Sequence, residues 1–192
     1  MLKWITNLTY KIEELATKIR PFYHLAASYY EDVVKREASL ASLSSQDHVL
    51  CIGGGICPFT AILFHQRTGA KVTVIDNNPE CIQYANKIIK DKNLDKEIQV
   101  LCQDGCCCHS LGLREFSVVH LALQVAPMDK VFSQVEQQVK DGTKIMIRRP
   151  RKQLGHLYSQ FLTKATGHLS FTTHGNKRNI GSTLLYVKGA TT

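Results

Sequence analysis

Three consecutive glycines and a downstream acid are the residues whose types and spacing best suggest chemistry. The stretch 49–60 reads V-L-C-I-G-G-G-I-C-P-F-T, so four apolar residues lead into Gly53, Gly54 and Gly55. Glycine suits a sharp turn against which a ligand lies, because it has no Cβ. A second apolar run, 71–76, ends in Asp76, 21 positions after Gly55. The pattern indicates a strand, a tight turn, a helix and a second strand, with Asp76 placed to hold the hydroxyls of a ribose.

The glycine turn also narrows the kind of ligand. A dinucleotide fingerprint needs a third glycine for close packing of helix on strand, and Cys57 and Pro58 stand at that place. NAD is therefore disfavoured, and a phosphate-binding P-loop is excluded because Gly-Lys-Ser/Thr is absent. S-adenosylmethionine, which has a ribose but no phosphate, fits best. The alternative is a tight turn with no ligand in an α/β domain. Candidate cofactor contacts in this first unit are Gly53, Gly54, Gly55, Pro58, Asp76 and Asn77.

The next two predicted strands add further candidates. The run 98–102 is followed by Asp104 and Gly105, and in this architecture a carboxylate there lies beside the adenine edge. Asp104 is therefore a candidate partner of the exocyclic amine, the alternative being a simple turn aspartate before glycine. The nearly continuous apolar run 116–123 is typical of a central parallel strand buried on both faces. Its last residues, Leu121 and Ala122, complete the predicted cofactor contacts.

The elements that position these residues alternate between helix and strand. Helices are predicted at 79–92, 127–140 and 152–166, with a proline at the first position of the helix that begins at Pro79. A fifth strand is predicted at 144–148, and a closing pair at 169–173 and 183–188. This order predicts an α/β fold with a doubly wound, mostly parallel Rossmann-like sheet and an antiparallel strand near its end, the layout of a class I methyltransferase.

Two helices are predicted before the first strand. Ile5, Leu8, Ile12, Leu15 and Ile19 form one apolar stripe on a helix that Pro21 ends, and a second helix follows at about 22–43. We therefore divide the chain into an N-terminal helical cap, 1–44, and an S-adenosylmethionine-binding Rossmann-like domain, 45–192. The spacing leaves open whether the helices cover the mouth of the cofactor site or only pack on one sheet face.

The composition of the chain indicates which classes of protein are possible. With 192 residues, 44% of them apolar, the chain is predicted to be globular. The net charge of +8 makes an anionic partner such as RNA a hypothesis to consider. The sequence shows no basic stripe with interleaved aromatic residues, however, so binding of nucleic acid is disfavoured. No apolar run reaches the ~18 residues of a membrane span, and the first residues begin no signal peptide. We expect a cytoplasmic protein that does not bind membranes.

Cysteines are the remaining notable residues. The seven cysteines are odd in number and lie largely in predicted strands or beside one another, so we expect reduced thiols. Cys102, Cys106, Cys107, Cys108 and His109 crowd one loop. Zinc sites usually draw ligand pairs from separate segments, so we expect no metal there. The sequence assigns the cluster Cys106 to Cys108 no role.

Several short motifs resemble the nicotianamine synthase family. The turn Gly-x-Gly-x-x-Pro-x-Thr at 53–60 is similar to the glycine turn of that family, and Tyr-x-x-Val-x-x-x-Glu at 30–37 resembles its Tyr-x-x-Leu-x-x-x-Glu. Met-Asp-Lys at 128–130, Ile-Met-Ile-Arg at 145–148 and Gly-His-Leu-Tyr at 155–158 look like further family segments. His174 and the stretch 179–182 are similar to its late His and Asn-Ser entry. The resemblance covers about 22–188.

The resemblance implies transfer of the aminobutyrate arm of S-adenosylmethionine, rather than its methyl group, to the amine of a small acceptor such as an amino acid. An amine attacks only when neutral, so a base must take its proton. Tyr30 is our candidate to orient the acceptor, Glu31 or Glu37 to accept the proton, and Arg148 to bind an acceptor carboxylate. The alternatives are a methyltransferase acting on a small molecule or, less favoured, RNA, and a non-catalytic nucleoside sensor. The sequence leaves the oligomeric state undetermined.

Overall fold

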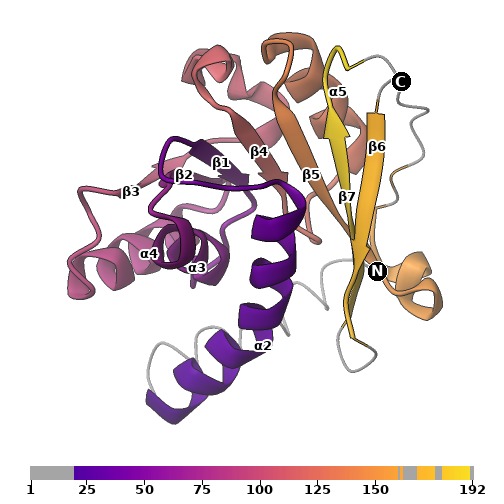
Figure 1. Ribbon diagram of the computed structural model, residues 1–192. Coiled ribbons are helices and arrows are strands. Elements are labelled where there is room, and N and C mark those ends of the chain that lie inside the picture. The colour runs from indigo at the N-terminus through magenta and orange to yellow at the C-terminus, as the bar shows by residue number, and fades with distance from the viewer. Residues whose placement is uncertain (1–19, 160, 162–167, 176–178, 191–192) are drawn as a thin grey trace.

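The computed structural model describes residues 20–159, 161, 168–175 and 179–190, with side chains from residue 28 onward (Figure 1). The first helix expected before Pro21 lies outside the described residues. The second begins the described chain as α2 (Arg20–Leu40), which ends three residues before the predicted boundary at Leu43.

A seven-stranded sheet forms the centre of the fold, with strand order β3-β2-β1-β4-β5-β7-β6. Strands β1 to β5 pair in parallel, while β7 is antiparallel to both β5 and β6. This confirms the predicted doubly wound sheet with an antiparallel closing pair and the class I methyltransferase layout. The strands are β1 (His48–Ile52), β2 (Lys71–Asp76), β3 (Ile98–Cys102), β4 (Val118–Leu121), β5 (Lys144–Pro150), β6 (His168–Thr173) and β7 (Ile180–Val187).

The crossover helices follow the predicted order. They are α3 (Phe59–Thr68), α4 (Pro79–Asp91) and α5 (Met128–Gln138), with short 3-10 turns η1 (Gly105–Leu111), η2 (Leu113–Glu115) and η3 (Lys152–Leu157). Helix α4 begins as predicted, because Pro79 fills its first turn and the Asn78 side chain accepts a hydrogen bond from the Glu80 amide at 3.0 Å. Within the described residues, no helix has the length and apolarity that a membrane crossing needs.

The helix expected over 152–166 is the one clear difference. Its first part is the 3-10 turn η3, which closes at Leu157 before an extended Tyr158. Gly155 sits inside this segment, and glycine disfavours a continuous α-helix by roughly 1 kcal/mol. The rest of the expected helix, 162–166, lies outside the described residues.

Side chains on the two faces of the sheet build two separate cores. On one face, residues of α2, α3 and α4, including Val34, Phe64 and Ile89, pack against Val74 and Met146 of the strands. On the other face, helix α5 and the η1 turn cover the sheet. Because both faces are covered, the strands read as continuous apolar runs. Figure 1 shows α3 and α4 on the side of the sheet that also carries α2.

Helix α2 packs along one side only. Val33, Val34, Glu37, Ala38 and Ala41 are buried, at the spacing of one helical face. The end of α2 is fastened to the sheet where the Lys144 ammonium of β5 donates to the Ala41 carbonyl at 2.6 Å. Among the side chains that the structure describes, the buried positions of α2 begin at Val33, so the second half of the helix covers a sheet face.

Candidate active site

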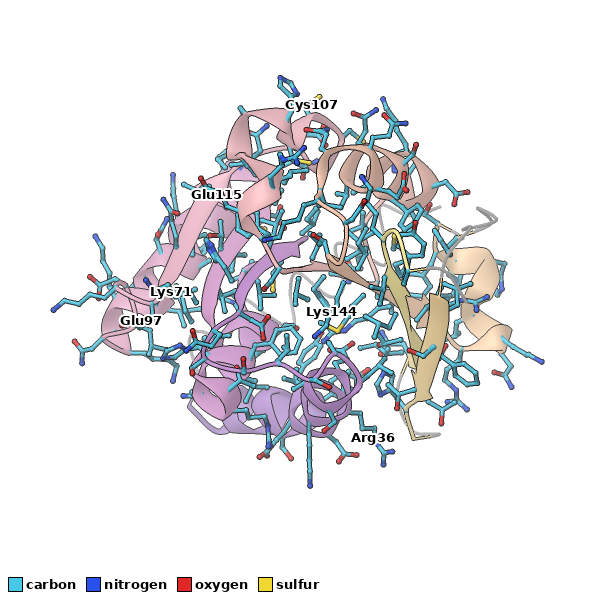
Figure 2. The ribbon with its side chains drawn as sticks, turned by 45° about the horizontal axis from the view of Figure 1, so that its top comes forward. Arg36, Lys71, Glu97, Cys107, Glu115 and Lys144 are labelled. Carbon is cyan, nitrogen blue, oxygen red and sulfur yellow. The ribbon has the colours of Figure 1, made fainter. Side chains whose placement is uncertain are left out.

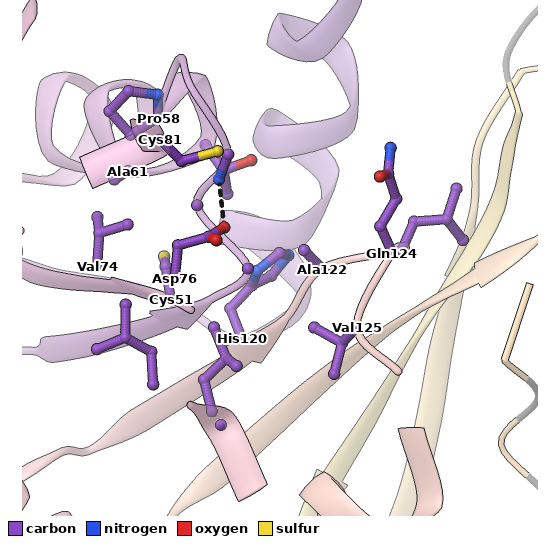
Figure 3. Close-up of a pocket in the computed structure, with 18 of the residues that line it drawn as sticks. Cys51, Pro58, Ala61, Val74, Asp76, Cys81, His120, Ala122, Gln124 and Val125 are labelled. Atoms are coloured by element: carbon purple, nitrogen blue, oxygen red, sulfur yellow. Dashed lines mark hydrogen bonds between the residues drawn. The ribbon is translucent and has the colours of Figure 1, made fainter. Parts of the chain in front are cut away.

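A cavity of about 320 Å³ opens where β1, β2 and β4 end. This is the edge at which open α/β sheets bind ligands, and the volume falls within the range of small-molecule sites. Nine of the ten predicted cofactor contacts line it, namely Gly53, Gly54, Gly55, Pro58, Asp76, Asn77, Asp104, Gly105 and Ala122. Figure 3 shows three of them, Pro58, Asp76 and Ala122, around this cavity.

The glycine turn has its shape for two reasons. Gly53 and Gly55 adopt φ values of +85° and +64°, which glycine reaches without strain. Gly54 has no room for a side chain, because an added Cβ would lie 2.2 Å from the Cγ1 atom of Val74. The amides of Gly53 and Gly54 both donate to the Ile75 carbonyl, at 2.9 and 3.2 Å. The turn is therefore held against the end of β2.

Asp76 holds this turn in place at the cavity wall by accepting hydrogen bonds from two backbone amides. Its Oδ2 atom accepts a hydrogen bond from the Gly55 amide at 2.9 Å, drawn as the dashed line in Figure 3, and its Oδ1 atom accepts one from the Asn78 amide at 3.0 Å. Each carboxylate oxygen has a second lone pair. Asp76 can therefore hold the turn and still accept hydrogen bonds from the hydroxyls of a ribose.

The side of the cavity that follows β3 contains Asp104 and Gly105. Asp104 caps the η1 turn, because its side chain accepts a hydrogen bond from the Cys106 amide at 2.8 Å. This matches the alternative role considered for Asp104 from the sequence, that of a turn aspartate before glycine. Its side chain is exposed. Gly105 is buried, and a Cβ there would meet Ile52 at 2.7 Å.

Leu121 is not a wall of the cavity. Its side chain is fully buried in the core on the α5 side of the sheet, together with Leu50 and Val119. The neighbouring Ala122 does line the cavity. Leu121 is the last residue of β4 and packs into that core, whereas Ala122 follows the strand at the point where the cavity opens.

Tyr30 brings helix α2 to the cavity. Its ring stacks on Phe59, the first residue of α3, with centroids 5.7 Å apart and planes 19° apart. On another side the Arg148 guanidinium carbon lies 5.6 Å from the centroid of the Tyr30 ring, within the range of a cation–π contact. Tyr30 and Arg148 both line the cavity, so the structure brings these two predicted residues together.

Glu37 and Arg148 form a buried pair behind this wall. Arg148 Nε and Nη2 donate to the two oxygens of Glu37 at 2.8 and 2.7 Å, and the Thr183 hydroxyl donates to Glu37 Oε1 at 2.6 Å. Burial opposes ionisation of Glu37, but the Arg148 charge outweighs it and holds the pKa of this carboxyl far below its ordinary value. The expected proton-accepting role of Glu37 does not fit these contacts, and the guanidinium expected to bind an acceptor carboxylate already holds this one.

Glu31 lies away from the cavity. Its carboxylate accepts from Arg67 Nη2 at 2.8 Å on the surface, with 57% of the side chain exposed. Helical spacing explains this, because Glu31 directly follows Tyr30 and adjacent helical residues differ in direction by about 100°. Glu31 is therefore poorly placed to take a proton from a ligand in the cavity.

His120 is a cavity residue that the sequence patterns did not single out. It lies on β4 opposite Cys51 of β1, with 1% of its surface exposed, and its Nε2 atom has no hydrogen-bond partner among the described residues. The nearest acid is Glu37, whose Oε1 atom lies 3.6 Å from Nε2. Burial, with a smaller effect of Arg148, lowers the pKa of His120. The available signal was a single histidine inside an otherwise apolar strand.

Asn179 closes the cavity near the start of β7. Its side-chain oxygen accepts from the Tyr29 hydroxyl, and its amide nitrogen Nδ2 donates to the Tyr158 hydroxyl at 3.2 Å. These contacts join α2, the segment after η3 and β7, which are far apart in the sequence. Gln124 also lines this part of the cavity, and neither residue was predicted from its spacing.

The cysteine cluster Cys106 to Cys108 follows Asp104 and Gly105 in the η1 turn. All seven cysteines are free thiols; Cys102 and Cys107 are exposed, whereas Cys108 is buried. Figure 2 shows Cys107 projecting from the periphery of the molecule. Among the residues that the structure describes, no three histidine, cysteine, aspartate or glutamate side chains come together as a metal site would require.

Comparisons with known proteins agree with this geometry. A family model described as "Nicotianamine synthase protein" matches residues 9–173. A structure of a glutamate-to-glutamine variant of MtNAS in complex with S-adenosylmethionine superposes with a TM-score of 0.78 at 25% identity, covering 97% of this chain and 76% of that one.

Two further proteins are more distant. An L-histidine 2-aminobutanoyltransferase of Yersinia pestis is 25% identical over 119 residues, which are 62% of this chain but only 43% of that protein. An RNA methyltransferase from Salinibacter ruber, solved with S-adenosyl-L-homocysteine, superposes with a TM-score of 0.62 at 18% identity over 83% of this chain and 93% of that one. This last likeness shows the fold alone.

Proposed function

The chain belongs to the nicotianamine synthase family, and from that premise we propose that it transfers the aminobutyrate arm of S-adenosylmethionine to the amine of a small amino acid. The observation that carries the proposal is the cavity at the strand ends. There the glycine turn and Tyr30, which match the family at short motifs, form the walls of one space together with Asp76.

The residues present suit S-adenosylmethionine. The glycine turn lines the cavity, Asp76 would accept hydrogen bonds from the ribose hydroxyls, and Asp104 would accept one from the exocyclic amine of adenine. No run of backbone amides with a Gly-Lys-Ser/Thr sequence is present to cradle phosphates. A nucleoside that carries an uncharged ribose and a charged arm fits these walls better than a nucleotide.

The transfer depends on which carbon faces the acceptor. The sulfonium supplies electrophilic carbons, and displacement requires an in-line approach at roughly 3 Å. Tyr30, fixed between Phe59 and Arg148, presents a rigid ring at the α2 side of the cavity, where it would orient the acceptor. The name of the Yersinia pestis protein supports an amino acid acceptor, and L-histidine is the first that we would test.

The products decide between aminobutyrate and methyl transfer. The purified protein is incubated with S-adenosylmethionine and L-histidine, then with other amino acids, and the spent nucleoside is identified by mass spectrometry. We expect methylthioadenosine above the protein-free control, together with an aminobutyrate adduct of the acceptor. S-adenosylhomocysteine with a methylated acceptor would overturn the proposal in favour of a methyltransferase. Tight binding with neither product would indicate a sensor.

A matched pair of variants tests whether S-adenosylmethionine binds in the cavity. Asp76→Asn keeps the shape of the side chain but removes the charge at the glycine turn, and charge-assisted hydrogen bonds contribute roughly 1.5–3 kcal/mol each. We expect its dissociation constant for S-adenosylmethionine, measured by calorimetry, to rise about 10- to 100-fold. Asp95→Asn, which removes the same charge from an exposed loop, is expected to leave binding unchanged.

A further inference from the structure

An amino acid acceptor brings a carboxylate into the cavity, next to the amine that attacks. Arg148, the residue predicted to bind this carboxylate, already donates from two of its nitrogens to Glu37. Among the described residues, no lysine and no other arginine lines the cavity. The carboxylate of the acceptor therefore needs a different hydrogen-bond donor.

The strand order shows where such a donor would lie. Asp76 ends β2, and β1, β4 and β5 separate β2 from β7 in the sheet. Strand β7 begins at Ile180, which pairs with Pro150 at the end of β5, so its start lies at the same edge of the sheet as the cavity. Asn179 immediately precedes β7 and lines the cavity on the side away from Asp76. This is the side left for the acceptor when the nucleoside lies against β2.

Hydrogen bonds hold the Asn179 carboxamide on both sides. Its oxygen accepts from the Tyr29 hydroxyl, and its Nδ2 atom donates to the Tyr158 hydroxyl at 3.2 Å. The backbone is fixed as well, because the Asn179 amide donates to the Tyr29 hydroxyl at 3.2 Å and its carbonyl accepts from the Arg151 amide at 3.0 Å. The orientation of the carboxamide is therefore set before a ligand arrives, which lowers the entropy cost of binding.

Packing keeps the two tyrosines in place. The Tyr158 ring is buried in an apolar cluster with Val33 and Ile180, and Tyr29 packs against the same cluster. Tyr29 also makes an edge contact with Tyr30, with ring centroids 5.0 Å apart and planes 82° apart. Because Tyr30 is the residue expected to orient the acceptor, the support of Asn179 and the aromatic wall form one packed unit.

The Asn179 carboxamide keeps one donor for a ligand. Its nitrogen carries two hydrogens. One goes to Tyr158, and the other has no acceptor among the residues that the structure describes. Gln124 also lines this side, and Figure 3 shows its side chain extending from the segment after β4. No hydrogen bond to a described residue fixes the Gln124 carboxamide, so Asn179 is the better-positioned donor.

We propose that Asn179 determines acceptor specificity by donating a hydrogen bond from Nδ2 to the carboxylate of the amino acid, and that Tyr29 and Tyr158 are its positioning residues. This assignment rests on the proposed function. A donor held in this way favours an amino acid over the amine that lacks the carboxylate, because the amine leaves the donor without a partner. It names the feature of the acceptor that is recognised at the end of the cavity away from the nucleoside.

The test compares two acceptors that differ only in the carboxylate. For L-histidine and histamine, or another accepted amino acid and its decarboxylated amine, kcat/KM is measured from methylthioadenosine formation. Wild type should prefer the amino acid. Asn179→Asp keeps the side-chain shape and can still accept from the Tyr29 hydroxyl, but it replaces the donor with a negative charge. Its ratio of the two kcat/KM values should fall at least about 10-fold, the effect of losing a hydrogen bond to a charged group.

Two further variants separate recognition from structure. Tyr29→Phe leaves the donor in place and removes part of its support, so its ratio should fall less, by about 3-fold, as for the loss of a neutral hydrogen bond. Asn86→Ala, which removes a half-exposed carboxamide of α4 outside the cavity, is the control and should keep the wild-type ratio.

The outcomes distinguish this assignment from the proposed function. If Asn179→Asp lowers kcat/KM equally for both acceptors, the role of Asn179 is structural and the assignment fails. A higher dissociation constant for S-adenosylmethionine with an unchanged ratio would also overturn it, because Asn179 would then contact the arm of the cofactor. If wild type forms no methylthioadenosine with any amino acid, the proposed function itself fails. Product formation with an unchanged ratio overturns only the role of Asn179.

Discussion

The Glu37 carboxylate on α2 and the Arg148 guanidinium on β5 form a two-pronged pair across 111 positions of sequence, with nitrogen–oxygen distances of 2.8 and 2.7 Å. Arg148 is 4% exposed and Glu37 is completely buried. The pair joins the cap helix to the central sheet, and the same guanidinium lies 5.6 Å from the Tyr30 ring centroid. One ion pair therefore fixes both the helix and the aromatic wall that the helix contributes to the cavity.

Replacing one partner should show how strongly the fold depends on this pair. In Glu37→Gln the Arg148 charge stays buried without a counter-charge, and breaking a buried pair in this way costs about 3–5 kcal/mol. We expect the free energy of unfolding in urea to fall by that amount. Glu31→Gln is the control, since its pair with Arg67 is half-exposed and contributes roughly 0–1 kcal/mol. Equal stability losses in the two variants would contradict a structural role for the buried pair.

Acid should destabilise the wild-type protein through the same carboxyl. The pKa of Glu37 is lowered in the folded state by Arg148, so its stabilising contribution is complete above the ordinary carboxyl pKa of about 4.5 and is lost as the pH falls below that value. We expect the free energy of unfolding to drop more steeply between pH 4.5 and 3 in wild type than in Glu37→Gln, as followed by urea denaturation at each pH. Parallel curves for the two proteins would show that other groups govern acid unfolding.

Much of the fold could be predicted from local patterns. The apolar runs, the Asn78-Pro79 helix start and the glycine turn each act over a few residues, so the order of strands and helices follows from them. The nucleoside end of the site was predictable for the same reason. Gly53 to Gly55 and Asp76 belong to one strand-turn-helix-strand unit, and their roles depend on that unit alone.

The other end of the site depends on tertiary contacts. Nothing local indicates that Glu37 meets Arg148, because the two come together only when α2 packs on the sheet. His120 was not predicted as a site residue, because it lies in a buried strand whose other residues are all apolar. Leu121 and Ala122 were both predicted as cofactor contacts, because an apolar run buried on both faces carries no alternation that would distinguish the residue in the core from the one that lines the cavity.

The reactivity of the cysteines should follow burial. Cys102 and Cys107 are exposed, whereas Cys51 is buried and the pKa of its thiol is raised to about 12 by desolvation. Brief treatment of the native protein with iodoacetamide, followed by peptide mass spectrometry, is expected to modify Cys102 and Cys107 and to leave Cys51 unmodified. In urea all three should react at similar rates. Rapid modification of Cys51 in the native protein would show that the cavity floor opens readily to solvent.

A single methyl group at Gly54 should weaken the binding of S-adenosylmethionine, whereas the same change at a glycine with open space around it should not. In Gly54→Ala the new Cβ would lie 2.2 Å from the Val74 Cγ1 atom, so the turn or β2 must move, at a typical cost of 1–3 kcal/mol. Because the turn carries the Gly55 amide that Asp76 holds, we expect the dissociation constant for S-adenosylmethionine to rise at least about 10-fold. Gly175→Ala is the matched control, since a Cβ there meets nothing within 4 Å. Calorimetry on the two variants would contradict this account of the turn if both bound S-adenosylmethionine as tightly as wild type.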